Sequence, residues 1–515
     1  MRKTICSGII TFGILVSLSS CYAFDYRSEE AGFSVDIPDD NTIIVSKDLF
    51  AAGSNKSMHG IAAISQQSIE KYTKTAFATN KFESDLKKIA EDIKAGKDIL
   101  ADPAYAYLTV PQNELQVYMQ KLMQDNPQSL PGNKNYKITK INKIPALEIN
   151  NDMLLNYEIK LPIAYTRKEQ QNIQKYNPYV KFSADGKQMT AQYNLISKIY
   201  ILSQNDQLYN ISSGYVEFPA IEQSETVFAE NNADKFIQKF TDNKVDKRAY
   251  KKFSKAFTKK LNFFKPQLSN SELIIKDGIF NKEFKVPHNW LYIQSNQKVE
   301  NMPVSLFSAL PVSSLEKMGK EYIDSKLFNI ETTKIGMNVE SNNIDDFDFS
   351  KILKAYSEGV IGISAEYKPA RPHDQGPKQF LENPVFTKIM FEEFMNKPFL
   401  NPREKAKLEK FVQIKNFTHD IDINQENCLL QFTYDVDLHL PQTLSKINRP
   451  GYDIFQETDL TDLSIHGQKK VYFDADNRIN LLCYFTQDKT MKSNLIQKEY
   501  DSYNLFKSSL LKEKY

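Results

Sequence analysis

The sequence is poor in the residues that most often carry catalysis or bind metals. Its 515 residues include six His, four Cys and a single Trp. It contains no Gly-x-Ser-x-Gly elbow, no His-Glu-x-x-His and no glycine-rich phosphate loop, and no two histidines have metal-ligand spacing on one helix face. The sequence therefore predicts no metal site and no cofactor, and it offers no recognisable catalytic constellation.

An excess of positive charge is also missing. The chain has 66 basic and 64 acidic residues, and two of the basic ones, Arg2 and Lys3, lie in an N-terminal leader that we expect to be removed. The remaining charges balance. Because a protein that binds duplex nucleic acid usually carries a basic excess to displace counterions from phosphate, this composition argues against nucleic acid as a partner.

The one long apolar run lies at the N-terminus. Arg2 and Lys3 precede an apolar core over Ile9–Leu18 and small residues over 19–23, which is the pattern of a signal peptide. About 10 apolar residues are too few to span a bilayer, which needs roughly 20. The sequence therefore predicts a signal peptide over residues 1–23 and export across the cytoplasmic membrane to the cell envelope, either the periplasm or the surface.

Two cleavage sites compete within this leader. Leu18-Ser19-Ser20-Cys21 resembles the lipobox of a bacterial lipoprotein, which would attach the mature protein to a membrane through a lipid on Cys21. Cys21-Tyr22-Ala23 also fits an ordinary signal-peptidase site, which would leave Phe24 as the first residue. Both cleavages remain open from the sequence.

Two cysteines follow far downstream, Cys428 and Cys483, both in candidate strands. In an exported protein such a pair indicates a disulfide. Two buried thiols are the alternative, because the sequence does not show that the strands lie close together.

The rest of the chain contains one series of motifs twice. The hairpin pattern of Lys198–Ile211, two apolar runs joined by an Asn-Asp turn, returns at Lys470–Phe485. Other pairs follow in the same order: Ser68-Ile69-Glu70-Lys71 with Ser314-Leu315-Glu316-Lys317, Pro111 with Pro384, and Leu154–Pro162 with Thr433–Pro441. The pattern predicts a tandem duplication, with a first α+β repeat over residues 24–243 and a second over 266–515, each an antiparallel sheet packed with helices.

The second copy is longer than the first, which predicts an insertion near residues 330–380. The insertion holds an acidic cluster over 345–348 and a turn-rich loop with Arg371, His373 and Asp374. Long loops that are not part of a repeat often carry function. His373 and Asp374 could act as the acid/base pair of a hydrolase, whereas the flanking prolines favour a rigid exposed loop without catalysis.

A basic amphipathic helix is predicted between the two copies, over residues 244–265. This segment has nine basic residues and one acidic residue, and its apolar residues recur at three- and four-residue steps. It would serve either as a connecting helix with its apolar side packed against a domain, which we favour, or as an attachment to an anionic membrane surface or polymer.

Both copies begin with a short strand that ends in proline, Phe33–Pro38 in FSVDIPDDN and Phe284–Pro287 in FKVPHNW. With the hairpin and helix that follow, this element resembles the PsbP-like fold, an α/β/α sandwich with an antiparallel sheet. The first copy lacks the Trp that the second provides at Trp290. The resemblance implies a non-catalytic binding or accessory domain, and it transfers no catalytic residues.

The function that these observations favour is non-catalytic binding or scaffolding in the cell envelope, with an envelope protein or polymer as partner. The contact surface would be a sheet face or the 330–380 insertion. Two hypotheses compete with it: a hydrolase centred on His373 and Asp374, and a peripheral membrane-surface protein that attaches through residues 244–265. The sequence does not determine the oligomeric state.

Overall fold

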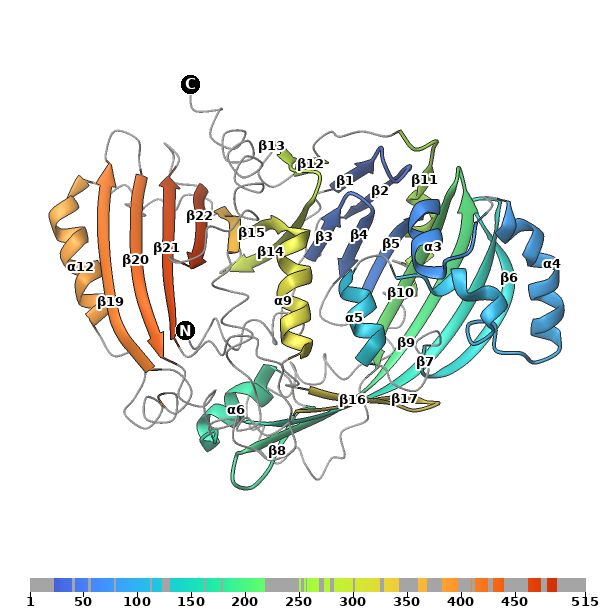
Figure 1. Cartoon of the computed structure of the whole chain (residues 1–515), viewed down its shortest axis with the longest axis horizontal. Helices are drawn as coiled ribbons and strands as arrows, with labels where there is room; N and C mark the ends of the chain where they lie inside the picture. Colours follow the sequence, from blue (N-terminus) through green and yellow to red (C-terminus); the bar gives the residue numbers. More distant parts are fainter. Residues whose placement is uncertain are drawn as a thin grey trace.

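The computed structural model shows a mixed α/β protein made mostly of strands, with helices packed on its sheets, and this confirms the predicted mixture (Figure 1). The structure describes residues 23–38, 42–53, 57–77, 80–111, 114–122, 130–161, 164–176, 179–217, 250–251, 254–255, 257–267, 273–277, 282–299, 302–324, 328–341, 360–367, 382–396, 409, 413–424, 429–439, 462–473 and 479–488.

A large antiparallel sheet runs through the whole molecule (Figure 1). Its first half has, in order of pairing, β6 (Asn133–Ile141), β7 (Ile144–Lys160), β9 (Gln188–Gln204), β10 (Gln207–Glu217), β5 (Ser57–Ser65), β4 (Leu49–Gly53) and β3 (Thr42–Ser46). It continues through β14 (Trp290–Val299), β15 (Met302–Pro311), β18 (Val360–Tyr367), β22 (Ile479–Asp488), β21 (Asp462–Phe473), β20 (Leu429–His439) and β19 (Gln413–Asn424).

Tight turns set the register of the long hairpins in the first half. Asn205 and Asp206 join β9 to β10 with φ values of 51° and 66°, and Asn142 and Lys143 join β6 to β7 with 48° and 71°. Two consecutive residues with positive φ make the two-residue turn whose twist matches that of the strands. The hairpin predicted at Lys198–Ile211 is confirmed, and the strands of its counterpart, β21 and β22, pair as predicted.

The sheet of the first half is buried on both faces, because successive side chains of a strand point to opposite sides. On one face Leu147, Ile201 and Leu208 pack with helices α3 (Gln66–Thr73) and α4 (Lys81–Lys94) and the 3-10 helix η1 (Pro103–Thr109). On the other face Leu202 and Tyr209 belong to a second cluster, which includes side chains of a smaller sheet. The first half therefore has three layers.

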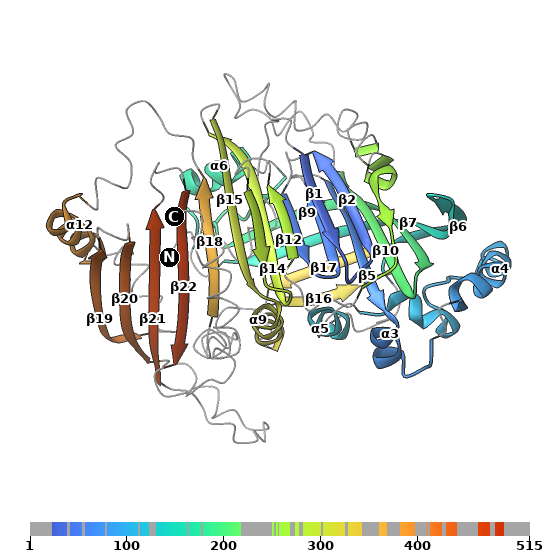
Figure 2. The same cartoon turned by 90° about the horizontal axis from the view of Figure 1, so that it is seen from above.

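The smaller sheet joins the two halves of the chain (Figure 2). Its five strands are ordered β11 (Asn262–Phe263), β2 (Phe33–Pro38), β1 (Ala23–Ser28), β12 (Leu273–Asp277) and β13 (Lys282–Val286). The central pair, β1 with β12, is antiparallel and comes from opposite halves. Nearby, His288 Nε2 contacts the Glu30 carboxylate, which also accepts a hydrogen bond from Lys47 Nζ at 3.3 Å.

Trp290, which opens β14, lies at the centre of this arrangement with none of its surface exposed. It packs in the same cluster as Tyr26, Phe33 and Val286, so side chains from both halves share one apolar core. Burial of an indole contributes several kilocalories of apolar stabilisation (about 3 kcal/mol, on the usual area scale). This tryptophan is therefore a core residue and not an exposed platform for stacking on a sugar ring.

The apolar residues between Ser68 and about Lys94 recur at three- and four-residue steps, which predicts one continuous helical run, but the segment forms two helices. Helix α3 begins after Ser65, whose Oγ accepts a hydrogen bond from the Ser68 N–H at 3.2 Å. It ends at Lys74, which has φ 55° and ψ 22°, a left-handed conformation that closes helices. The apolar spacing predicted one stripe, but that spacing does not detect a left-handed residue inside the run.

Helices α5 (Glu114–Leu122) and α9 (Val312–Asp324) lie side by side across the same face of the main sheet as α3 (Figures 1 and 2). They come from opposite halves. The Glu114 N–H donates to Glu316 Oε1 at 3.3 Å, and Lys320 Nζ lies 5.9 Å from the centre of the Tyr118 ring. Burial raises the pKa of Glu316, and the acceptor role at the start of α5 only partly offsets this.

The predicted insertion supplies strands as well as loops. Within it lie β16 (Phe328–Thr332), β17 (Gly336–Ser341) and β18, which enters the main sheet between β15 and β22. Strand β17 pairs in parallel with β7, and Gly336 lies so close to Leu154 that a Cβ there would overlap the Leu154 carbonyl oxygen. Part of the insertion therefore ties the second half to the first.

Candidate functional site

Most of the residues proposed from the sequence lie outside the described residues: Cys21, Arg371, His373, Asp374, Cys428 and the acidic cluster over 345–348. Cys483 lies on β22, where its backbone is opposite Lys470 of β21, and its side chain is also outside the described set. The lipid on Cys21, the disulfide and the loop hydrolase thus stay predictions.

The described part of segment 244–265 is helical at 250–251, 254–255 and 257–260, but Asn262–Phe263 form strand β11, so the helix predicted to run to residue 265 ends earlier. Two members of its apolar side, Phe257 and Leu261, are each 1% exposed and belong to the core cluster beneath the smaller sheet. Phe257 stacks on Phe50 of β4 with ring centroids 6.2 Å apart. Lys255, Lys259 and Lys260 are on the outer side. This packing favours the interpretation as a connecting helix.

A histidine is buried under this helix. His59 of β5 lies directly opposite Ser213 of β10, with His59 Nδ1 2.6 Å from Ser213 Oγ. Tyr250 stacks on the imidazole and donates its hydroxyl to the Ser213 carbonyl oxygen at 3.0 Å. Burial lowers the pKa of His59 to about 4, because an imidazolium ion would lose its hydration there. The site holds a neutral histidine in a packed core.

The duplicated Ser-Ile/Leu-Glu-Lys motif places a lysine three positions after a serine near the start of α3 and of α9, a spacing that some serine hydrolases use. In α3 the two side chains have different partners. Ser68 Oγ lies 3.1 Å from Ser65 Oγ, whereas Lys71 Nζ lies 2.7 Å from Glu114 Oε1. A lysine that is ion-paired elsewhere does not activate the serine. The contacts in α3 therefore favour a structural role for this motif over a catalytic one.

The outer part of the second half carries a polar sheet face, which we call the His/Asp ladder. It consists of three directly opposed pairs between β20 and β21: Asp435 with His466 at 2.8 Å, Asp437 with Ser464 at 2.7 Å, and His439 with Asp462 at 2.8 Å. Such cross-strand pairs stabilise a sheet. The serine donates to a carboxylate and not to an imidazole, so these six residues do not form a Ser-His-Asp relay.

The same end of the molecule exposes apolar side chains. In the described part of the chain ten large apolar side chains are exposed, and six of them lie on α12 (Pro384–Asn396) or β19. On α12 these are Val385 at 70%, Phe386 at 53%, Ile389 at 49% and Met390 at 45%. We call these four side chains the α12 apolar face. An exposed group of this kind usually marks a site of interaction.

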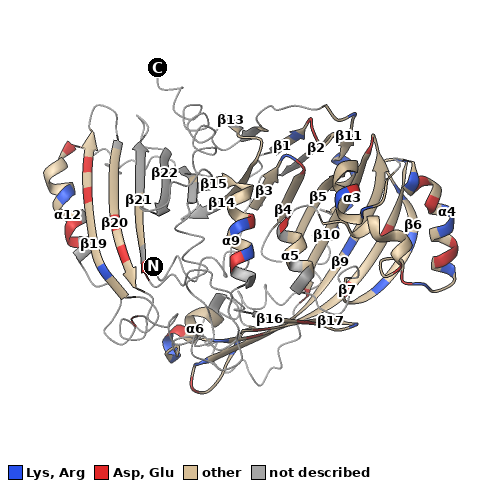
Figure 3. Ribbon diagram, in the orientation of Figure 1, with Lys and Arg blue, Asp and Glu red and all other residues tan. Residues whose placement is uncertain are grey.

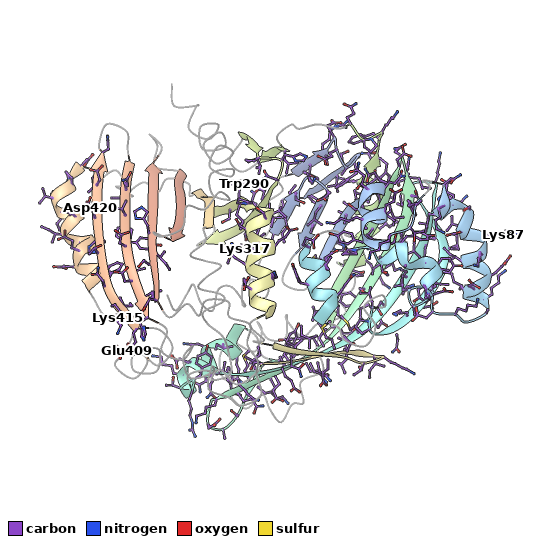
Figure 4. The ribbon with its side chains drawn as sticks, in the orientation of Figure 1. Lys87, Trp290, Lys317, Glu409, Lys415 and Asp420 are labelled. Atoms are coloured by element: carbon purple, nitrogen blue, oxygen red, sulfur yellow. The ribbon has the colours of Figure 1, made fainter. Side chains whose placement is uncertain are left out.

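The opposite end of the sheet is closed differently. Helix α4 flanks β6 there, as α12 flanks β19, and Lys87 and Asp420 mark the two ends in Figure 4. The inner side of α4 buries Phe82 and Ile89. Its exposed residues are charged or small: Glu83, Ser84, Lys87, Lys88, Glu91 and Lys94 (Figure 3). Each helix thus covers one end of the sheet, but α12 exposes apolar side chains to solvent whereas α4 exposes charged or small ones.

Sequence reasoning missed the α12 apolar face, although a signal was present. The helix PVFTKIMFEEFMN has apolar residues on nearly all sides, and such a helix is normally buried all round. Only the structure shows which side of α12 is exposed to solvent. Thr387, which is 1% exposed, lies on the inner side, so the four apolar side chains lie on the outer side.

No protein-family model matches the chain, and no curated protein or solved structure matches it. Among the described residues there is no group of three or more His, Cys, Asp or Glu side chains that could hold a metal ion. In the same part of the chain, none of the helices has the length and apolar character needed to cross a membrane.

Proposed function

We propose that this chain is an exported, non-catalytic binding protein of the cell envelope, and that it docks a protein partner through α12 and the adjacent β19. The observation that carries the proposal is the α12 apolar face, which leaves Val385 and Phe386 more than half exposed. An exposed apolar group is costly to keep in water, and the matching helix at the other end of the sheet has a charged outer side. That contrast supports a role in recognition.

The leader supports the envelope location. A basic start, a short apolar core and small residues before Phe24 make up the export signal. Strand β1 begins at Ala23, two positions after Cys21. If Cys21 carries the lipid, only Tyr22 separates the anchor from the smaller sheet. Two residue steps of extended chain span about 7 Å, so the sheet would lie against the membrane.

We also propose that the fold consists of two related α+β units, residues 24–243 and 266–515, joined by the connecting segment 244–265. The order of pairing supports this. Strands β4, β5, β10, β9, β7 and β6 correspond to β14, β15, β22, β21, β20 and β19, with β18 as the insertion. Helices α3 and α9 follow corresponding strands. The resemblance to the PsbP-like fold belongs with this proposal.

Export is tested by the intact mass of the chain isolated from membrane and soluble fractions of its native cells. A mass starting at Phe24, or at a lipid-modified Cys21, is the expected result. A full-length chain that keeps Met1 in the soluble cytoplasm would contradict the envelope location.

Docking is tested with the double substitution Val385→Ser and Ile389→Ser. Both side chains are exposed, so the fold and the thermal midpoint should stay unchanged, while the envelope complex that contains the chain should be lost from chemically cross-linked cells. The matched control is Lys87→Ser with Glu91→Ser on α4, which should keep the complex. Equal behaviour of the two variants would refute docking through α12.

A further inference from the structure

The α12 apolar face has the geometry of a helix-docking site. Residues four apart on a helix lie on one side of it, so Val385 lies beside Ile389 and Phe386 beside Met390. Glu393 continues the same side and is also exposed. The apolar strip extends about 8 Å along the axis at 1.5 Å per residue. That length suits two successive anchor side chains of a second helix.

This molecule already packs helices in that manner. Helices α5 and α9 come from different halves and lie side by side on the sheet. The face of α12 that points away from the sheet has no such neighbour among the described residues, as its exposed fractions show. A helix laid along it would cover the strip.

Among the described residues of α12 and β19, negative charge predominates around the strip. Residues 382–396 and β19 together contain five carboxylates, on Glu382, Glu392, Glu393, Asp420 and Asp422, against two lysines, Lys388 and Lys415 (Figure 3). Lys388 Nζ lies 3.7 Å from Asp420 Oδ1, so one of the two cations is already engaged with a carboxylate. Glu382 and Glu393 are exposed near the two ends of the apolar strip.

This charge selects among occupants. A second copy of the chain that docked through its own α12 face would bring its carboxylates against these, and like charges across an interface are repulsive. An anionic lipid surface attracts Lys and Arg, and here acidic side chains predominate. A helix with apolar side chains flanked by Lys or Arg would both cover the apolar strip and bring positive charge to the carboxylates around it.

We infer that α12 binds an amphipathic helix of a partner protein, in which apolar residues four apart fill the strip over Val385–Met390 and flanking basic residues pair with Glu382 and Glu393. The inference rests on the proposed binding function and names the chemistry of its partner. It assigns recognition of the partner's apolar side chains to α12 and recognition of its charge to the acidic residues at the two ends.

The test is a titration of the mature chain with two synthetic helical peptides. The first peptide has Leu along one side of the helix and Lys along the other. The second peptide has the same Leu positions, with Glu in place of each Lys. We expect the Leu/Lys peptide to bind roughly tenfold more tightly, since charge complementarity favours it. The Val385→Ser/Ile389→Ser variant should lose roughly tenfold in affinity for that peptide because two anchors are removed. The Lys87→Ser/Glu91→Ser control should bind like the wild type.

A second pair of variants separates charge from apolar contact. Glu382→Gln with Glu393→Gln should weaken Leu/Lys binding about threefold and make it less sensitive to salt, because exposed ion pairs are screened. Asp185→Asn, on the connection between β8 (Lys181–Phe182) and β9 in the first half of the chain, is the control for removal of a carboxylate elsewhere and should have no effect.

Four results would overturn the inference: equal binding of both peptides, no loss in the α12 variant, self-association of the chain that the α12 variant abolishes, or binding to phosphatidylglycerol vesicles that this variant abolishes. If both peptides fail while the same variant still loses the envelope complex, the inference fails and the proposed docking function stands. If the variant keeps the complex as well, both fail.

Discussion

At the scale of single residues, the buried His59 links the stability of the fold to pH. Its pKa is lowered to about 4 by burial, whereas an unfolded histidine has about 6.5. Between these values the unfolded chain binds more protons than the folded one, so stability is fully present above pH 6.5 and falls as the pH drops toward 4. The shift corresponds to about 3 kcal/mol at most.

We therefore expect the urea midpoint of unfolding to decrease steadily from pH 7 to pH 4, and the His59→Gln variant to show a flatter dependence. His466→Gln is the matched control, because that imidazole is partly exposed, with 31% of its side chain accessible. A His59→Gln profile as steep as that of the wild type would show that another group causes the acid sensitivity.

Tyr107 illustrates how single hydrogen bonds hold the outer helix α4. Its hydroxyl donates to Asp85 Oδ2 at 2.8 Å, and Lys81 Nζ lies 2.9 Å from the same oxygen. Burial and the neighbouring carboxylate raise the pKa of Tyr107, so the phenol stays protonated and donates at neutral pH. We expect Tyr107→Phe to cost about 1 kcal/mol in urea unfolding. An unchanged midpoint would show that this bond adds nothing to stability.

At the scale of secondary-structure elements, local signals predicted best. The Asn205-Asp206 turn was identifiable because these residues tolerate positive φ and lie between two alternating runs. The break between α3 and α4 was not, because it depends on one lysine in a left-handed conformation. The place of β18 between β15 and β22 depends on contacts far apart in the sequence, and motif spacing contains no information on such pairings.

Pairing of β17 with β7 depends on a glycine. A Cβ at Gly336 would overlap the backbone of Leu154, so we expect Gly336→Ala to destabilise the protein by roughly 1–3 kcal/mol through overpacking. Gly214→Ala is the control, since the nearest atoms to a Cβ there are 3.5 Å away or more. Thermal midpoints measured side by side would decide, and equal midpoints would contradict a close approach at Gly336.

The sequence predicted that the protein has a contact surface, but it did not locate that surface on α12. A sheet face or the insertion was expected to make contact, and the structure points to the outer end of the second half, where α12 lies beside β19. Apolar residues on nearly all sides of α12 were visible in the sequence. Which of them remain in water is decided by packing with the sheet, and packing cannot be inferred from one helix.

At the scale of the whole molecule, the two halves share their main structural layers. Strands β1 and β12 pair at the centre of the smaller sheet, β3 pairs with β14 in the main sheet, and α5 packs beside α9. We therefore expect calorimetry to show a single unfolding transition. Two well-separated transitions would contradict this coupling and show that the halves unfold independently.

The central claim is that one end of this sheet is a docking surface and the other is not. Photo-cross-linking in native cells tests it most directly, with a photoreactive amino acid placed at Phe386 on α12 or at Lys87 on α4, both exposed. We predict a discrete heavier adduct from position 386 and none from position 87. Adducts of the same size from both positions, or from neither, would contradict the account.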